Sequence, residues 1–67
     1  MSTNFQTITT RLYSDEAREQ INARNLAYRL DDLNAYGRNG YTLTSTVTAV
    51  TSEDTTIIDT LALTEPH

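Results

Sequence analysis

One corner of the chain constrains its fold more than any other stretch. Before the corner, leucines recur at helical spacing, at Leu26, Leu30 and Leu33. This spacing predicts a helix over about residues 25–36 whose leucines face a sheet. The pattern stops at residues 37–40, Gly-Arg-Asn-Gly, where glycines tolerate the backbone conformations that end a helix, with Gly37 expected to be left-handed. Apolar and polar side chains then alternate over residues 41–50, which predicts a strand directly after the helix.

Two further strands complete the expected order. Residues 5–13 are rich in aromatic and β-branched side chains and predict a first strand, either face of which could be inward. Residues 55–63 predict a third strand, after a polar turn at residues 51–54 and before a tail at residues 64–67. We therefore expect a single α+β domain over residues 1–67. Its order is β-α-β-β, a three-stranded antiparallel sheet with one main helix packed on one face.

The segment between the first strand and the main helix allows two interpretations. Ser14-Asp15-Glu16 is typical of a helix start, because a hydroxyl caps free N–H groups and carboxylates suit the helix dipole. The apolar residues that follow form two stripes on nearly opposite sides of an ideal helix: Ala17, Ile21 and Tyr28; Ala23, Leu26, Leu30 and Leu33. Either the chain breaks near residues 22–25, which leaves residues 14–24 as a loop or short helix, or one long helix faces its sheet with one stripe and a second subunit with the other. We favour the break.

The second and third strands each show an apolar face. In the second strand this face carries Tyr41, Leu43, Val47 and Ala49, opposite Thr42, Thr44, Thr46 and Thr48. The threonine face is either solvated, or a surface where a second sheet or a dimer mate packs. In the third strand Ile57, Leu61 and Leu63 share their face with Asp59. We expect Asp59 to lie at an edge or to pair with an arginine such as Arg29 or Arg11, with a ligand site as the alternative.

Composition excludes several kinds of chemistry. The 67 residues include no cysteine and one histidine, the terminal His67, so we expect no metal, no cofactor and no Ser-His-Asp triad. The net charge of −4 argues against nucleic acid and anionic membranes as partners. No apolar run has the length of a membrane span and no signal peptide is visible, so we expect a soluble cytoplasmic protein. So short a chain gains little from its own core, which favours a homo-oligomer, most simply a dimer.

Six side chains near the helix and its exit combine arginine with tyrosine. They are Arg24, Tyr28, Arg29, Tyr36, Arg38 and Tyr41. Protein interfaces use this combination in their hot spots, and nucleotide sites use it to stack a base and hold a phosphate. We take the six as candidate residues for binding a partner or ligand. In the competing interpretation the tyrosines pad the margin of the core and the arginines solvate the helix.

The corner also carries a motif, Leu33-Asn34-Ala35-Tyr36-Gly37, followed by Gly40-Tyr41. It resembles a small bacterial and phage family of unknown function, whose helix ends in Leu-Asn-x-x-Gly before a Gly followed by Trp or Tyr. The match covers about residues 26–63, with Tyr41 where tryptophan is commoner and a longer connection at residues 14–25. The resemblance implies a β-α-β-β domain that often self-associates, and it transfers no catalytic residue.

Two functions are compatible with these features. The first is a non-enzymatic interaction module, a small homo-oligomeric accessory protein, of the kind found in bacteria and their phages, that binds a host or regulatory protein. The second is a protein that sequesters a small anionic ligand, such as a nucleotide-type signal, at subunit interfaces lined by arginine and tyrosine. An enzyme is not expected, because the groups that most nucleophilic and metal-dependent reactions need are missing.

Overall fold

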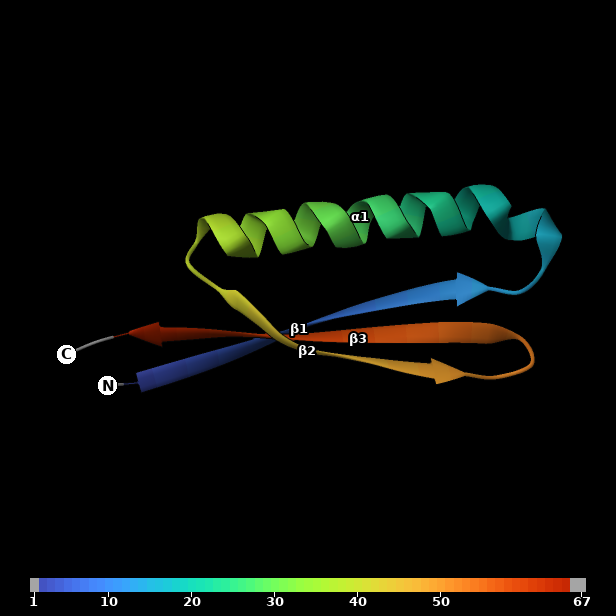
Figure 1. The fold of residues 1–67 in the computed structure, drawn as a ribbon. Helices are drawn as coiled ribbons and strands as arrows, with labels where there is room; N and C mark the ends of the chain where they lie inside the picture. The colour runs from blue at the N-terminus through green and yellow to red at the C-terminus, as the bar shows by residue number, and fades with distance from the viewer. Residues whose placement is uncertain (1, 66–67) are drawn as a thin grey trace.

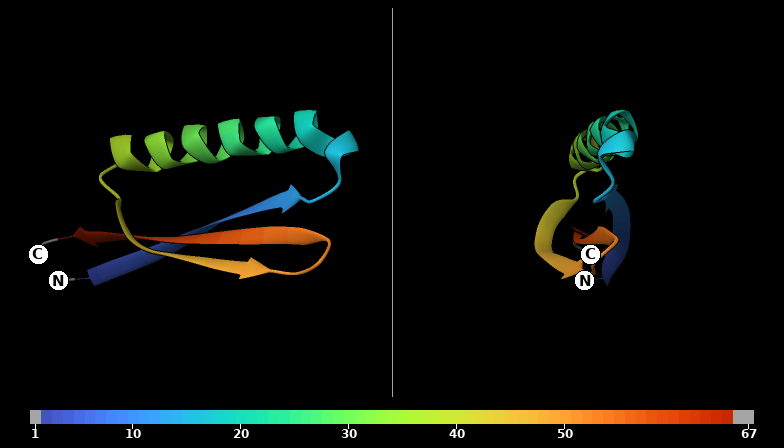
Figure 2. Two further views of the ribbon diagram at one scale, coloured as in Figure 1. Left: turned by 45° about the vertical axis from the view of Figure 1, so that its right-hand side comes forward. Right: turned by 90° about the vertical axis from the view of Figure 1, so that its right-hand side faces the viewer.

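The computed structural model describes residues 2–65 and confirms the α+β prediction. Its elements are β1 (Ser2–Tyr13), the 3-10 helix η1 (Glu16–Arg18), α1 (Glu19–Arg38), β2 (Thr42–Val50) and β3 (Asp54–Glu65). The three strands form one antiparallel sheet in the order β1-β3-β2, with β3 in the centre. α1 runs along one face of the sheet and the other face is open (Figures 1 and 2). The result is a thin two-layer body with extents of 50 × 21 × 10 Å.

α1 is continuous, so the break favoured near residues 22–25 is wrong. The helical segment begins much earlier than residue 25, because the Asp15 carboxylate accepts a hydrogen bond from the backbone N–H of Ala17 at 3.0 Å and caps η1. α1 then follows at Glu19 without interruption. The segment expected to be a loop or short helix therefore forms η1 and the first part of one long helix.

A polar row of α1 faces the sheet, and this explains the two apolar stripes. Asn22, Asn25 and Arg29 each contact β1 or β3 through hydrogen bonds. The apolar stripes therefore lie on the two flanks of the helix. Leu26 and Leu30 are 43% and 58% exposed, so the expectation that they face the sheet is wrong.

The helix ends one residue beyond Gly37 and the chain turns at Gly40. The structure places Gly37 within α1, and Gly40 has the positive φ, +88°, so the expectation of a left-handed Gly37 is wrong. A Cβ atom added at Gly40 would lie 3.2 Å from Leu63 Cδ1, which adds a steric reason for glycine there. The backbone N–H of Tyr41 donates to the carbonyl of Tyr36 at 3.0 Å and directs the chain into β2.

The register settles which residues face α1. Ile8 of β1 lies opposite Asp59 of β3, and Thr10 lies opposite Ile57. Ile8 and Thr10 are buried, so the even-numbered side of β1 is its inward face. The predicted third-strand face that carries Asp59 is the one beneath the helix, since Asp59 hydrogen-bonds an α1 side chain.

A β-bulge changes the faces of β2. The register with β3 shifts between Leu43 and Ser45, so Thr44 is the extra residue. Leu43 therefore lies opposite Leu61 on the helix side, whereas Val47 lies opposite Ile58 on the open side. The prediction that Leu43 and Val47 share one face is wrong, because one inserted residue reverses every later side chain.

β1 and β3 are longer than expected because they pair along their whole length. The ladder runs from Ser2 opposite Glu65 to Tyr13 opposite Asp54. Thr64 and Glu65, expected in a tail, therefore belong to β3, while residues 66–67 of that tail lie outside the described residues.

The core of the single chain is small. Within residues 2–65 only two apolar side chains are buried, Ile8 and Leu61. Large apolar side chains that stay exposed outnumber them: Phe5, Ile21, Leu26, Tyr28, Leu30, Leu43, Val47, Val50 and Ile58. The surface area is 4865 Å², whereas a compact monomer of this mass exposes about 4,250 Å².

Candidate functional site

A buried ion pair joins the middle of α1 to the central strand. Arg29 Nε donates to Asp59 Oδ2 at 2.7 Å, and Arg29 Nη2 donates to Asp59 Oδ1 at 2.9 Å. Thr46 Oγ1 of β2 donates to the same Oδ1 at 2.7 Å. The Asp59 side chain is 0% exposed and that of Arg29 is 26% exposed. The structure thus confirms Arg29 as the partner of Asp59.

The ion pair keeps both groups charged. The Arg29 hydrogen bonds lower the pKa of Asp59, burial opposes them, and the Thr46 hydroxyl adds to the lowering. The pKa of Arg29 is raised, chiefly by its hydrogen bonds to Asp59. A carboxylate held in this way is a poor general acid or base near neutral pH. Its role is to fix the polar row of α1 on the sheet.

The ion pair predicts a loss of stability in acid. Because the pKa of Asp59 is lower in the folded chain than in the unfolded chain, its stabilising effect is complete above the unfolded value of about 3.9. The effect disappears as the pH falls through the folded value. We expect urea denaturation, followed by circular dichroism, to show the free energy of unfolding falling below about pH 4.

The control for this prediction is the double variant Arg29→Met/Asp59→Leu, which lacks both charges. It should lose less stability than the parent between pH 5 and 3, because its other carboxylates are unchanged. Equal losses in the two proteins would contradict the assigned role of Asp59.

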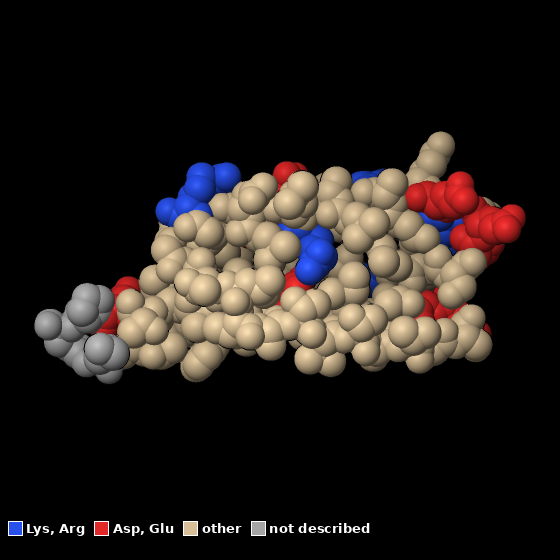
Figure 3. Space-filling view, viewed as in Figure 1, with Lys and Arg blue, Asp and Glu red and all other residues tan. Residues whose placement is uncertain are grey.

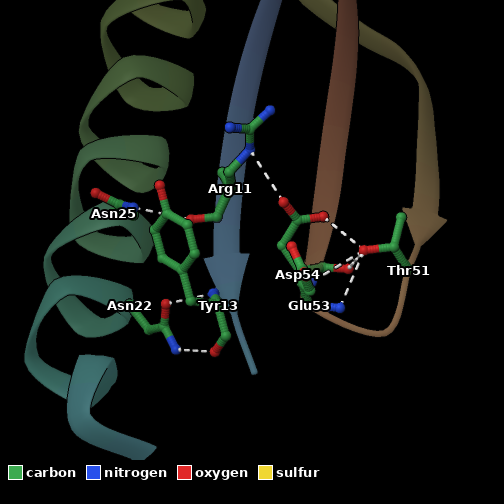
Figure 4. A network of polar contacts seen from close by, with 7 residues as sticks. All are labelled: Arg11, Tyr13, Asn22, Asn25, Thr51, Glu53 and Asp54. Carbon is green, nitrogen blue, oxygen red and sulfur yellow. Dashed lines mark hydrogen bonds and ion pairs between the residues drawn. The ribbon is translucent and has the colours of Figure 1, made fainter. Parts of the chain in front are cut away.

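A second polar group joins α1 to the outer edge of β1 (Figure 4). Asn22 Oδ1 accepts from the backbone N–H of Tyr13, and Asn22 Nδ2 donates to the carbonyl of Tyr13, both at 2.7 Å. Asn25 Nδ2 donates to the carbonyl of Arg11 at 2.8 Å. Sequence reasoning missed these residues, although two asparagines three apart inside a helix are a signal, because asparagine is unfavourable there.

The same end of the molecule carries a polar turn and a cavity. Thr51 Oγ1 accepts from the backbone N–H groups of Glu53 and Asp54, at 3.2 and 3.1 Å (Figure 4). The Arg18 guanidinium lies 4.5 Å from the centroid of the Tyr13 ring. The cavity has a volume of about 510 Å³ and is lined by Tyr13, Ser14, Asp15, Arg18, Ser52, Glu53 and Asp54. It combines both signs of charge, and within residues 2–65 no three acidic, histidine or cysteine residues are placed to hold a metal.

The six residues proposed from the sequence do not converge. Tyr36 and Tyr41 pack edge to face with centroids 5.1 Å apart, at the exit of the helix. Arg29 is paired with Asp59, and Tyr28 and Arg29 both line a cavity of about 370 Å³ between α1 and β1.

Arg24 and Arg38 are exposed and lie far from each other. They are 14 residues apart on one helix, which is about 21 Å. Of the six proposed residues, the structure therefore brings together two pairs, Tyr36 with Tyr41 at the helix exit and Tyr28 with Arg29 at the cavity beside β1. The binding role of the six stays a prediction.

Two apolar surfaces remain, one on each face of the sheet. The first, the open sheet face, is centred on Phe5, Val47 and Ile58, which point away from α1 by the register of their strands. Its other positions include small and hydroxyl side chains: Thr7, Thr9, Ser45, Thr60 and Ala62. The face combines a large aromatic side chain with a neutral surround, a pattern that suits contact with another protein.

The second surface, the β2-side surface, consists of Leu26, Leu30, Leu43 and Val50. On the helix, Leu26 and Leu30 fall opposite Tyr28 and Asp32, which line the cavity beside β1. The two leucines therefore project toward β2. α1 packs mainly over β1 and only slightly over β2, so nothing within the described chain covers this surface.

Figure 3 shows the molecule in space-filling form from the β2 side, as comparison with the two views of Figure 2 establishes. Most of this side is uncharged in Figure 3, and the largest cluster of acidic side chains lies at the end that holds η1 and the β2–β3 turn.

No family model, curated protein or solved structure matches this chain. The family resemblance carried by the corner motif at residues 33–41 therefore stays a prediction. Of the helices described, none combines the length and apolar character that crossing a membrane requires.

Proposed function

We propose that this chain is a non-catalytic interaction module, a small cytoplasmic accessory protein that self-associates and acts by binding another protein. The observation that supports this proposal is the imbalance, within residues 2–65, between two buried and nine exposed large apolar side chains. Contiguous exposed apolar surface in a small protein marks sites of interaction. The corner motif supports a bacterial or phage setting, in which the partner is a host or regulatory protein.

The open sheet face is the surface that we assign to the partner protein. Phe5 is an aromatic anchor on the outer strand, opposite Ala62, and Val47 and Ile58 form an apolar pair on the same face further along β3. Aromatic anchors surrounded by neutral side chains dominate the binding energy of many interfaces. The face carries few charges, which favours a protein partner over a nucleic acid.

The experiment that tests this assignment compares three immobilised full-length chains: the parent, the variant Phe5→Lys, and the control Ile21→Lys on the far flank of α1. Proteins retained from a bacterial lysate are quantified by mass spectrometry, and each candidate is then purified and titrated. We expect one protein to bind the parent and the control alike, and to bind Phe5→Lys at least about 30-fold more weakly. If no purified candidate distinguishes Phe5→Lys from Ile21→Lys, the assignment is wrong.

The sequestration of a small anionic ligand has less support. The arginines proposed for it are dispersed along α1, and Arg29 is already neutralised by Asp59. A ligand site of this kind would need cations from a second subunit. We therefore retain protein binding as the proposed function.

A further inference from the structure

The two edges of the sheet differ in how their backbone groups are satisfied. In β1, Asn22 occupies both the N–H and the carbonyl of Tyr13, and Asn25 occupies the carbonyl of Arg11. An edge strand directs the backbone groups of alternate residues outward. The amide side chains of α1 thus cap the end of this edge, where a further strand would otherwise pair.

The ladder identifies the outward groups of β2. Tyr13 lies opposite Asp54 in the ladder. Because the backbone N–H and carbonyl of Tyr13 point away from β3, those of Asp54 and of every second residue after it point toward β2. This agrees with the Thr60 carbonyl, which accepts from Thr44 Oγ1 of β2 at 3.0 Å. The β2 residues opposite this set direct their backbone groups toward β3, as Val47 does opposite Ile58. The outward backbone groups of β2 are therefore those of Thr46, Thr48 and Val50.

Nothing in the described chain blocks this second edge. No side chain of residues 2–65 hydrogen-bonds the outward backbone of β2. Residues 42–52 contain no charge and no proline, the two commonest devices that keep edge strands apart. They are instead rich in threonine and valine, which favour strand pairing. The β1 edge is thus capped at Arg11 and Tyr13, whereas the described chain provides no such cap for the β2 edge.

We propose that a second copy of this chain pairs its β2 with this β2, antiparallel about a two-fold axis. The two sheets become one sheet of six strands. An antiparallel pair within one sheet requires an axis perpendicular to that sheet, so both helices lie on the same face. The inference rests on the self-association in the proposed function and names its interface.

A second copy suits this edge for three reasons. The free strand is self-complementary, since identical uncharged strands meet without bringing the acidic ends together. The β2-side surface, with Leu26 and Leu30 above the edge, meets the same surface of the copy. The surface area exceeds that of a compact monomer by about 600 Å², which is about what each partner buries in the smallest specific interfaces.

Amide hydrogen exchange of the unmodified protein tests the pairing directly. In a monomer the N–H groups of Thr46, Thr48 and Val50 face water, as those of Thr7 and Thr9 do on the uncapped part of the β1 edge. In the proposed dimer the β2 amides should exchange at least about 100-fold more slowly than those of Thr7 and Thr9. Equal rates at the two edges would overturn the proposal.

A matched pair of proline variants tests the β2 pairing through the molecular mass of each protein in solution. Thr48→Pro removes an outward N–H that the single chain does not use, and Thr7→Pro does the same at the other edge. In sedimentation equilibrium Thr48→Pro should have the mass of one chain, 7.5 kDa. Thr7→Pro should keep about twice that mass. A dimeric Thr48→Pro would overturn the β2 pairing.

The outcomes separate this interface from the proposed function. A dimeric Thr48→Pro refutes β2 pairing but leaves self-association in place. A monomeric parent refutes both self-association and its interface. If Thr48→Pro does not fold, as judged by circular dichroism, hydrogen exchange of the parent still decides.

Discussion

Replacing Arg29 by methionine is expected to destabilise the folded chain by about 3–5 kcal/mol, because it leaves Asp59 charged and buried without its partner. Asp59 is fully buried, and without Arg29 the Thr46 hydroxyl is the only group within residues 2–65 that still hydrogen-bonds its side chain. A domain of this length has a total stability of about 3–10 kcal/mol. We therefore expect the variant to be largely unfolded at room temperature, as measured by urea denaturation.

Two controls sharpen this result. Arg24→Met changes an exposed arginine of the same helix and should alter the free energy of unfolding by no more than about 0.5 kcal/mol. The double variant Arg29→Met/Asp59→Leu should recover much of the loss, because an apolar pair carries no desolvation cost. If Arg29→Met is as stable as Arg24→Met, the ion pair does not hold α1 on the sheet.

Replacing Leu61 by alanine has the second-largest expected effect, a loss of about 2–5 kcal/mol. Leu61 is only 2% exposed and lies on the central strand, opposite Leu43. With so few buried apolar side chains, the single chain has little other core to compensate. Thermal and urea denaturation should both show the loss.

The matched control is Val47→Ala, which removes apolar atoms from a side chain that is 57% exposed on the open sheet face. Its cost should stay below about 1 kcal/mol. A Leu61→Ala variant that loses no more stability than Val47→Ala would show that the small core does not stabilise the fold.

The order of elements could be predicted from the sequence because its signals are local. The leucine spacing, the glycine-containing corner and the alternating strand each extend over about ten residues or fewer. The partner of Asp59 could also be anticipated, since a charge on an apolar strand face requires one. The structure confirms Arg29 in that role.

The orientation of α1 could not be predicted, because it depends on groups far away in the sequence. Apolar stripes suggested a leucine face toward the sheet, whereas the Asn22, Asn25 and Arg29 row faces it. This row satisfies the β1 backbone and a buried carboxylate, and buried polar groups need such partners. Sequence periodicity alone predicts that the apolar row of a helix, rather than its polar row, faces the sheet.

The bulge at Thr44 could not be predicted from the sequence either. It appears only when β2 is aligned with β3, and the alternation in the sequence continues across it without a mark. Its consequence is large, because it divides the apolar residues of β2 between two surfaces. The two candidate interfaces of this molecule arise from that division.

The mass and unfolding of the unmodified chain test the central claim most directly, namely that apolar surface left open by one chain is covered by another. Sedimentation equilibrium at micromolar concentrations should give a species of about twice 7.5 kDa. Its unfolding temperature should rise with protein concentration, since association stabilises only the folded chain. A species of 7.5 kDa that unfolds cooperatively at the same temperature at every concentration would contradict the claim.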